Sequence, residues 1–237
     1  DPVKIKEYTE KELSAVQYLL TLVNDVLDIG KMETGKILLE HKPFDLIEVL
    51  QDTLSIVCTN AARHSLVLKG GKDMSRVLHR YVIGSPKHLE RILMNIGSNA
   101  VKYNRAGGTI TFYCNEVSAD KEEAVYQFIC EDTGIGMSED YQKHVFEPYS
   151  QEGKESYTSF SGTGLGLPIA KSITEQMGGT ITFESQENVG TKFVVTIPLE
   201  LDQNKQKEEK KKETAERIKL DGKKALLVDD NELNCEI

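Results

Sequence analysis

The segment EDTGIGMSEDYQKHVFEPYSQEGKESYTSFSGTGLGLPIAK, residues 131–171, contains two glycine clusters that are separated by a long polar stretch. The first cluster, DTGIG at 132–136, follows an apolar run at 125–130 that is typical of a buried strand. The second cluster, GTGLG at 162–166, leads into Pro168, and proline suits the first turn of a helix. Glycines just before a helix leave backbone N–H groups free for a phosphate. The second cluster is therefore a candidate phosphate-binding loop.

The polar stretch between the clusters is longer than an ordinary connection inside a compact domain. It has few apolar anchors, so we expect residues 137–161 to form a lid that is poorly ordered without a ligand. Phe146 and Tyr149 are the exceptions, and we expect both to pack at the base of the lid. The alternative is two surface turns around a mobile loop, which the presence of two clusters disfavours.

Composition excludes several classes of protein. The 237 residues carry a formal net charge of −9, which argues against general nucleic-acid binding. The four cysteines are widely spaced and form no CxxC pair, so we expect reduced thiols rather than zinc or a disulfide framework. The five histidines show no metal-ligand spacing. No apolar run reaches membrane-span length, and no signal-peptide pattern opens the chain.

Residues 4–34 are predicted to form one helix. Its apolar residues alternate three- and four-residue steps, as in the seam of a coiled coil: Leu13, Val16, Leu20, Val23 and Leu27. Additional apolar residues widen this face beyond a two-stranded seam and favour a helical bundle. An ordinary amphipathic helix that faces a core is the alternative.

The next part of the chain is interpreted as strand, helix, strand, strand. The first strand is expected at Ile37–His41, and Asp45 can cap the helix that follows. Short strands are expected at 66–68 and 81–83, separated by a Gly-Gly turn and a polar stretch.

A second functional element begins at Ser85 and Pro86, which are good start signals for a helix that runs to about Tyr103. Asn95, Asn99 and Lys102 share one face of this helix. Asparagine is a poor residue for a helix interior, so two of them one turn apart need a reason. A solvated polar face is one explanation. The other is that the Asn99 amide oxygen ligates Mg²⁺ beside phosphate oxygens and that Lys102 contacts the phosphates.

The remaining elements are two hairpins and a helix. The hairpins are expected at 109–130 and 180–199, and the helix between them ends at Met177 before two glycines. The predicted fold class is therefore α+β, a two-layer sandwich of a mixed, mostly antiparallel sheet covered by about three helices on one face.

These motifs together resemble a known family, the sensor histidine kinases. Five segments occur in the order of that family's N, G1, F, G2 and G3 boxes: 95–103, 132–136, 146–149, 162–167 and 189–191. The resemblance covers residues 4–200 and implies the Bergerat-type ATP-binding fold of the GHKL superfamily, which includes gyrase, MutL and the ninety-kilodalton heat-shock chaperones. Asn95 stands where the gyrase-type ATPases carry a catalytic glutamate, which favours a kinase.

The resemblance also implies roles for individual residues, with ATP and Mg²⁺ as cofactors. Asn95 and Lys102 are the implied catalytic residues, and Asn99 is the implied Mg²⁺ ligand. Asp132 is expected to accept the adenine amino proton, and Phe146 to anchor the lid. The implied nucleotide-binding residues are Asn99, Tyr103, Asp132, Gly134, Gly136, Phe146, Gly162, Thr163, Gly164, Leu165, Gly166 and Thr191.

Domain organisation follows from the same resemblance. Residues 1–35 are similar to the second helix of a kinase dimerisation domain, and 36–200 to the catalytic ATP-binding domain. Residues 201–221 form a charged linker, and 222–237 resemble the truncated start of a receiver domain, with Asp229 and Asp230 as its acidic pair. No histidine here has the setting of a phosphoacceptor, so the first dimerisation helix is expected to be absent and the fragment not to phosphorylate itself.

The sequence thus predicts the catalytic domain of a hybrid sensor histidine kinase that transfers the ATP γ-phosphate to a histidine of the dimerisation domain. Expected partners are the parent's own dimerisation and receiver domains and a response regulator or phosphotransfer protein, with a homodimer in the intact protein and no nucleic acid. The expected location is cytoplasmic, and an inner-membrane anchor in the parent stays open. The alternatives are a non-kinase GHKL ATPase and a pseudo-kinase scaffold that binds nucleotide.

Overall fold

The computed structural model describes residues 38–70, 75–151 and 163–207, together with isolated positions between residues 8 and 30. Every described position of that first segment is helical, as the apolar pattern predicts. Its described apolar side chains are more than half exposed: Val16, Leu19, Leu20, Val23 and Leu27.

The chain divides into two compact units, residues 1–202 and residues 203–237. In the second unit only residues 203–207 are described, and they are helical. The expected receiver segment at 222–237 and most of the expected linker therefore lie outside the described residues.

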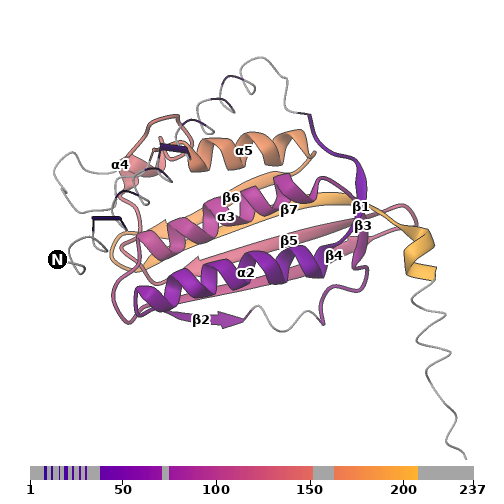
Figure 1. The fold of residues 1–237 in the computed structure, drawn as a ribbon, viewed down its shortest axis with the longest axis horizontal. Coiled ribbons are helices and arrows are strands. Elements are labelled where there is room, and N and C mark those ends of the chain that lie inside the picture. The colour runs from indigo at the N-terminus through magenta and orange to yellow at the C-terminus, as the bar shows by residue number, and fades with distance from the viewer. Residues whose placement is uncertain are drawn as a thin grey trace, which may run out of the picture. The chain divides into compact units, whose positions relative to one another are not determined.

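The first unit contains one mixed sheet of seven strands, in the order β1-β3-β7-β5-β4-β2 with β6 beside β7 (Figure 1). Among the described strands only β2 and β4 run parallel, and the other pairs are antiparallel. The elements are β1 (Lys42–Asp45), α2 (Leu46–Arg63), β2 (Val67–Gly70), β3 (Tyr81–Gly84), α3 (Pro86–Lys102), β4 (Thr109–Ala119), β5 (Glu123–Asp132), α4 (Glu139–Gln142), α5 (Gly166–Gln176), β6 (Thr180–Gln186) and β7 (Gly190–Leu201).

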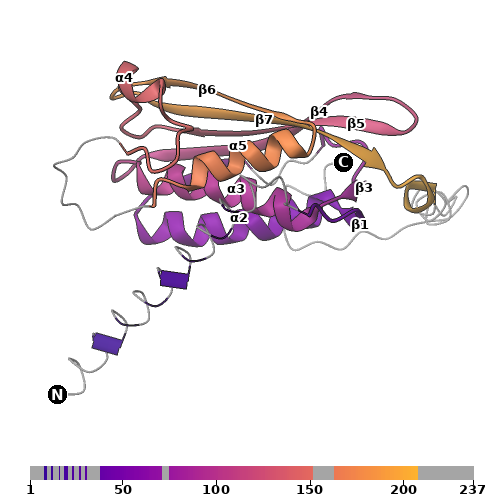
Figure 2. The same ribbon diagram turned by 90° about the horizontal axis from the view of Figure 1, so that it is seen from above.

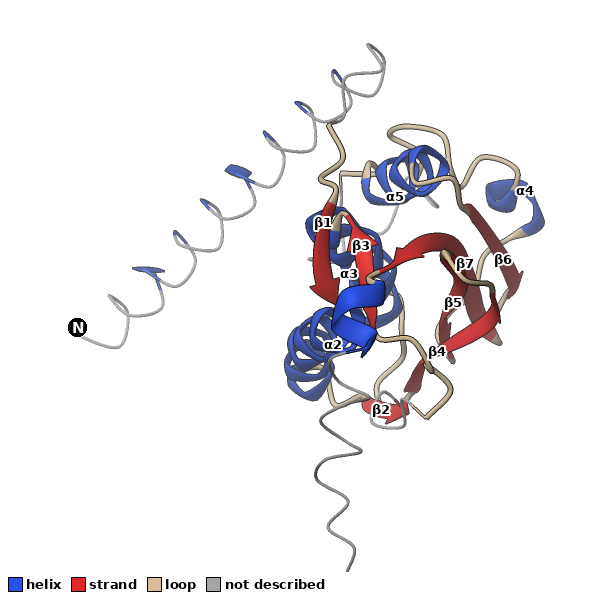
Figure 3. Cartoon of the chain, turned by 90° about the vertical axis from the view of Figure 1, so that its right-hand side faces the viewer, coloured by secondary structure: helices blue, strands red, loops and turns tan. Residues whose placement is uncertain are grey.

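Three helices, α2, α3 and α5, cover one face of this sheet and form the second layer (Figure 2). The short helix α4 lies beside the outer strand β6 (Figure 3). The predicted α+β sandwich, with its mostly antiparallel sheet and three covering helices, is confirmed.

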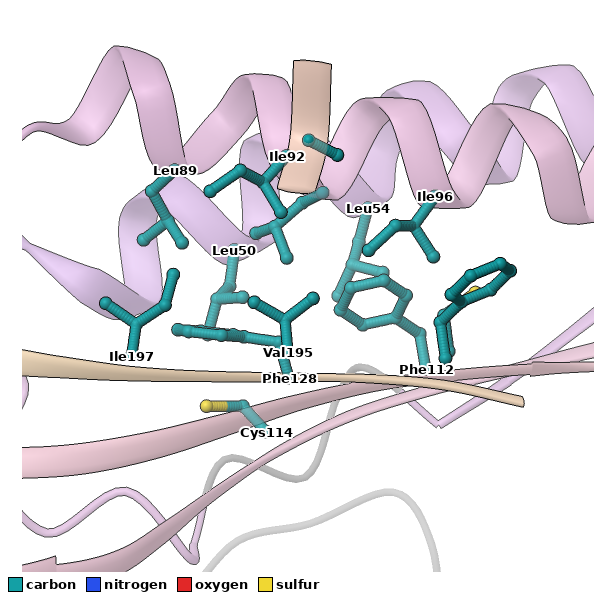
Figure 4. Close-up of a cluster of buried hydrophobic side chains, with 14 of the residues drawn as sticks. Leu50, Leu54, Leu89, Ile92, Ile96, Phe112, Cys114, Phe128, Val195 and Ile197 are labelled. Carbon is teal, nitrogen blue, oxygen red and sulfur yellow. The ribbon is translucent and has the colours of Figure 1, made fainter. Parts of the chain in front are cut away.

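The hydrophobic core fills the space between the two layers. Leucines and isoleucines of α2 and α3 face aromatic and β-branched side chains of the central strands (Figure 4). The largest of these strand residues, Phe112 and Phe128, are at most 2 % exposed. Alternate residues of β4 are buried because successive side chains of a strand point to opposite faces. This core holds α3, which carries Asn95, beside α5, which begins at Gly166.

The start of α2 agrees with the sequence prediction. The Asp45 side chain accepts a hydrogen bond from the Ile47 N–H at 3.0 Å, as an N-cap does. The Arg80 guanidinium also pairs with this carboxylate, with Nε 3.0 Å from Oδ2. Arg80 therefore links the beginning of α2 to the segment just before β3.

The predicted position of the first strand is wrong. A strand was expected at Ile37–His41, but the strand is β1 at Lys42–Asp45, and residues 38–41 are irregular. Pairing with β3 decides its position, because Lys42 lies opposite Gly84 and Asp45 opposite Tyr81. Pro43 is tolerated there since β1 is an edge strand.

Ser85 lies at the predicted N-cap of α3, but its side chain makes no capping hydrogen bond. Its Oγ instead accepts from the Glu40 N–H at 3.1 Å and lies 2.6 Å from His88 Nδ1. Ser85 therefore fastens the segment before β1 to the first turn of α3.

Candidate nucleotide-binding site

Asp132 ends β5 in a nearly dry environment. Its side chain accepts a hydrogen bond from the Gly134 N–H at 2.8 Å, and the residue is 9 % exposed. Burial raises the pKa of this carboxyl to about 6, although the backbone N–H groups of Gly134 and Thr191 oppose the shift. A carboxylate that is held in place but poorly solvated is well suited to accept a hydrogen bond from an amino group of a ligand.

Thr191 lies directly opposite Asp132, on β7. It is 8 % exposed, and its Oγ1 is 2.9 Å from the Ser185 hydroxyl on β6. The structure therefore brings the predicted Asp132 and Thr191 together. Ser185 supports Thr191 but has no signal in the sequence, because only the pairing of β6 with β7 brings the two hydroxyl groups together.

The glycines of the first cluster are required by close contact with the protein's own backbone. A Cβ at Gly134 would lie 2.3 Å from the Tyr103 carbonyl oxygen. A Cβ at Gly136 would lie 2.0 Å from the Gln186 carbonyl oxygen. The Ile135 N–H between them donates to the Tyr103 carbonyl at 3.0 Å. The cluster thus passes between the end of α3 and the turn after β6.

Lys102 and Tyr103 form a pair at the end of α3. The Lys102 ammonium donates to the Tyr103 hydroxyl at 2.8 Å and lies 4.5 Å from the centre of the Tyr103 ring. Tyr103 is 44 % exposed, so both groups remain open to a ligand at this edge of the first cluster.

Asn95 faces the second glycine cluster across the helix layer. A Cβ at Gly166 would lie 3.3 Å from Asn95 Oδ1, so α3 and α5 approach closely here. The Asn95 Nδ2 is buried, and the described part of the chain offers it no hydrogen-bond partner. A buried donor without a partner is costly, and native structures usually satisfy it with protein, water or a ligand. Asn99 lies one turn further along the same face of α3.

The second cluster is described from Thr163 onward, and Gly162 lies outside the described residues. α5 begins at Gly166, and no side chain caps it. The first backbone N–H groups of a helix have no partner inside the helix, so those of α5 can donate to an anionic ligand. The side chain of Leu165 is fully buried in the core, and its N–H is 3.1 Å from Thr163 Oγ1. The Leu165 side chain therefore belongs to the core. Only the backbone of Leu165 can contact a nucleotide.

The first part of the expected lid is well formed. Residues 137–151 contain α4, and the side chains of Met137 and Val145 are buried, so this part has more apolar anchors than expected; poor order without a ligand stays a prediction. Phe146 packs as expected, edge to face with Phe183 at 5.7 Å between ring centres. The Tyr149 side chain is 65 % exposed and does not pack at the base. Residues 152–161 of the expected lid lie outside the described residues.

One further contact joins the loops around the site. Arg105, just after α3, donates through Nη2 to Asn188 Oδ1 at 2.9 Å. The Asn188 N–H donates to the Ile135 carbonyl at 2.6 Å. The turn between β6 and β7 is thereby held against the first glycine cluster. Neither contact leaves a sequence signal, since the partners are far apart in the chain.

Comparison with known proteins identifies the family to which this chain is similar. Residues 84–201 match the family model described as "Histidine kinase-, DNA gyrase B-, and HSP90-like ATPase". The sensor protein GacS of Pseudomonas syringae pv. syringae is 34 % identical over 215 residues, which is 91 % of this chain and 23 % of GacS. BarA of Escherichia coli K12, a signal transduction histidine-protein kinase, is 33 % identical over 78 % of this chain and 20 % of BarA. Hybrid signal transduction histidine kinase F of Dictyostelium discoideum is 33 % identical over 82 % of this chain and 17 % of that protein. The chain thus spans about a fifth of the length of these relatives.

Solved structures share the fold. Full-length ShkA, whose crystal structure is a complex with AMPPNP, superposes with a TM-score of 0.67 at 24 % identity over 83 % of this chain and 39 % of ShkA. The Acinetobacter baumannii histidine kinase AdeS superposes with a TM-score of 0.58 at 22 % identity over 82 % of this chain and 84 % of that chain. The match of residues 84–201 to the family model, together with the relatives at 33–34 % identity, shows that the chain belongs to the family of histidine kinase-, DNA gyrase B- and HSP90-like ATPases, with an ATP-binding domain of the histidine-kinase type.

Proposed function

We propose that residues 36–200 are the catalytic domain of a hybrid sensor histidine kinase, which binds MgATP and transfers its γ-phosphate to a histidine of a dimerisation domain. The observation that carries this proposal is the Asn95 side chain: its Oδ1 lies near Gly166 at the start of α5, and its buried Nδ2 has no hydrogen-bond partner among the described residues. A polar donor at an uncapped helix N-terminus suits an anionic ligand, and a phosphate oxygen or its bound water can accept from it.

The remaining residues recognise the two ends of the nucleotide, the adenine and the phosphates. Asp132 accepts a hydrogen bond from the adenine amino group, with Thr191 and Tyr103 beside it. At the other end, the backbone of 162–166 and the Lys102 ammonium neutralise the phosphates. In phosphoryl transfer the protein mainly positions the reactants and compensates their charge, so no covalent step by this domain is needed.

Mg²⁺ fits the donor set of α3. The described residues contain no group of three or more His, Cys, Asp or Glu side chains that could hold a metal by themselves. The Asn99 amide oxygen is a hard ligand of the type that Mg²⁺ accepts together with phosphate oxygens and water. When bound, Mg²⁺ would be held by Asn99 and would neutralise part of the negative charge of the phosphates.

The non-kinase ATPase is the less favoured alternative. A water-activating carboxylate is expected at position 95 in that class, and this chain has Asn95 instead. The carboxylate that α3 carries is Glu90, which is exposed. The pseudo-kinase scaffold is distinguished from the kinase only by a phosphotransfer assay.

We further propose that the segment 1–35 belongs to the dimerisation domain, 201–221 to a linker and 222–237 to a receiver. The hybrid kinases among the relatives support this order, and with it a homodimer and a response regulator or phosphotransfer protein as partners. No helix in the described residues has the length and apolarity that a membrane crossing requires. Cys58, Cys114 and Cys130 are free thiols, which supports the proposed location in the reducing, ATP-containing cytoplasm.

Phosphotransfer in trans is the direct test of the kinase. With MgATP labelled at the γ-position, we expect label on an added dimerisation domain that carries its own histidine, but none on this chain. Acid-labile, base-stable label on this chain would mean that one of its own five histidines accepts phosphate. ATP binding without any transfer would favour the scaffold instead.

Replacing Asn99 by Ala tests the Mg²⁺ ligand. We expect Asn99→Ala to lose the increase in ATP affinity that Mg²⁺ produces, while affinity without Mg²⁺ changes little. Ser98→Ala is the matched control, because Ser98 is an exposed neighbour on the same helix. Calorimetric titrations with Mg²⁺ and with EDTA measure the difference, and an equal Mg²⁺ effect in wild type and Asn99→Ala would remove Asn99 from the site.

A further inference from the structure

Lys171 makes an unusual contact for a residue on the outer part of α5. Its ammonium lies 5.1 Å from the centre of the Phe146 ring. It also lies 3.9 Å from the Glu175 carboxylate, one turn along the helix. The side chains of Lys171 and Glu175 are 44 % and 58 % exposed, so the ion pair is weak because water screens it. The contact with the ring is the more specific of the two.

Phe146 is itself fixed to the sheet. Its ring packs edge to face against Phe183 of β6, with 5.7 Å between centres. Phe183 packs in turn against Phe193 of β7 at 5.8 Å, and Phe193 is 5 % exposed. Lys171 is therefore attached, through one ring, to the β6–β7 part of the sheet.

The chain that follows Phe146 returns to α5 from the other direction. The Tyr149 N–H donates to the Gly164 carbonyl at 3.1 Å. A Cβ at Gly164 would lie 2.9 Å from the Tyr149 backbone, so the two segments touch directly. The turn 146–149 is thus joined to α5 at two places, to the loop just before the helix and to the Lys171 ammonium.

We propose that Lys171 is a positioning residue of the nucleotide site. Its cation–π contact holds Phe146 and the turn 146–149 against α5, and the turn in turn holds the backbone of Gly164 where the phosphates are bound. This inference rests on the proposed nucleotide-binding function. Lys171 acts through Phe146, so its replacement weakens nucleotide binding without removing a phosphate contact.

Nucleotide affinity is the first measurement. An exposed cation–π contact corresponds to roughly a two- to fivefold change in an equilibrium constant. We expect Lys171→Met to weaken binding of a fluorescent ATP analogue by that factor. Lys171→Arg keeps the cation over the ring and should restore most of the affinity. Glu175→Gln is the matched control, since it removes the ion pair and leaves the ring contact, and it should bind as wild type does.

A spectroscopic measurement reads the contact itself. The chain has no tryptophan, so Phe146→Trp introduces a single reporter that retains the aromatic face. We expect Lys171→Met in this background to change the tryptophan emission, and Glu175→Gln to leave it unchanged. In a Phe146→Leu background, Lys171→Met should cause no further loss of affinity, since the partner ring is already gone.

Three results would overturn the proposal. The first is wild-type affinity together with unchanged emission in Lys171→Met. The second is a Lys171→Arg variant as weak as Lys171→Met. The third is a loss of affinity on Lys171→Met in the Phe146→Leu background that is as large as in the wild-type background. That result would indicate a direct contact between Lys171 and a phosphate. If the wild-type chain binds no nucleotide at all, the proposed function itself fails. If the wild-type chain and Lys171→Met bind nucleotide equally well, only the role of Lys171 fails.

Discussion

Asp132→Asn is expected to weaken ATP binding by roughly 1.5–3 kcal/mol, the contribution of a hydrogen bond to a charged group. In the proposed site the buried carboxylate accepts a hydrogen bond from the adenine amino group, whereas an asparagine offers a neutral and weaker acceptor. Calorimetric titration of both proteins with MgATP at pH 7.5 measures the loss. Equal affinities would show that Asp132 does not contact the base.

The same carboxylate should make ATP binding depend on pH. Its pKa is about 6 in the folded protein, raised above the ordinary value of 3.8 mainly by burial. ATP needs the ionised form as acceptor, so affinity should fall as the pH drops below about 6. Asp132→Asn should lack this dependence, and Glu131→Gln should keep it because Glu131 is exposed. A fall of the same size in all three proteins would assign the effect to another group.

Asp132→Asn should also make the empty protein more stable at neutral pH. A carboxyl whose pKa is higher in the folded state stabilises the fold fully below pH 3.8, and this contribution is lost as the pH rises through about 6. At pH 7 the charged, poorly solvated Asp132 therefore lowers the free energy of unfolding. The asparagine variant should gain on the order of 1–3 kcal/mol there and little in acid.

Urea unfolding without nucleotide, at several pH values from acid to neutral, measures this difference. A difference between Asp132→Asn and wild type that grows between pH 4 and pH 7 is the expected result. A constant difference, or the same difference in Glu131→Gln, would contradict the role of burial. Stability and function are thus expected to change in opposite directions at one residue.

Gly136→Ala is expected to destabilise the fold by roughly 2–4 kcal/mol and to reduce ATP binding. Gly136 has φ of 68°, and a Cβ there would lie 2.0 Å from the Gln186 carbonyl oxygen. The left-handed backbone costs an alanine about 1–2 kcal/mol, and displacing the turn after β6 adds the loss of its hydrogen bonds. One of these is the 2.6 Å bond from the Asn188 N–H to the Ile135 carbonyl.

Gly107→Ala is the matched control for this prediction. Gly107 has a similar φ of 78°, but nothing lies within 4 Å of the place where its Cβ would be. It should lose only the conformational cost of about 1–2 kcal/mol and bind ATP normally. Urea midpoints and nucleotide titrations of both variants give the comparison. If Gly136→Ala and Gly107→Ala lower the free energy of unfolding equally, the contact with the Gln186 carbonyl does not contribute to the destabilisation.

The helices and hairpins around the site could be predicted from the sequence, because their signals are local. The capping residue Asp45 and the residues at 85–86 mark where α2 and α3 begin, and 3.6-residue periodicity marks their buried faces. Pairs of β-branched runs around tight turns mark both hairpins. The two glycine clusters and the Asn95–Asn99 spacing predict the proposed nucleotide site for the same reason, since each motif lies within one short segment.

The position of β1, by contrast, was decided by pairing with β3, about forty residues away. The role of Ser85 likewise depended on Glu40, which the chain brings back to the start of α3. A capping serine and a serine that binds a distant backbone N–H have the same local sequence. Local patterns therefore could not separate the two.

The sequence by itself determined which segments are the candidates for binding the nucleotide and which residue types they carry, since helix periodicity, caps and glycine clusters act over a few residues. Only the tertiary structure decided what surrounds them. The dry setting of Asp132, the Asn95 amide against Gly166 and the Lys171 ammonium over Phe146 all join segments that are far apart in the chain. Burial and contact depend on packing across the whole sheet, and such long-range packing leaves no periodic trace in either partner segment.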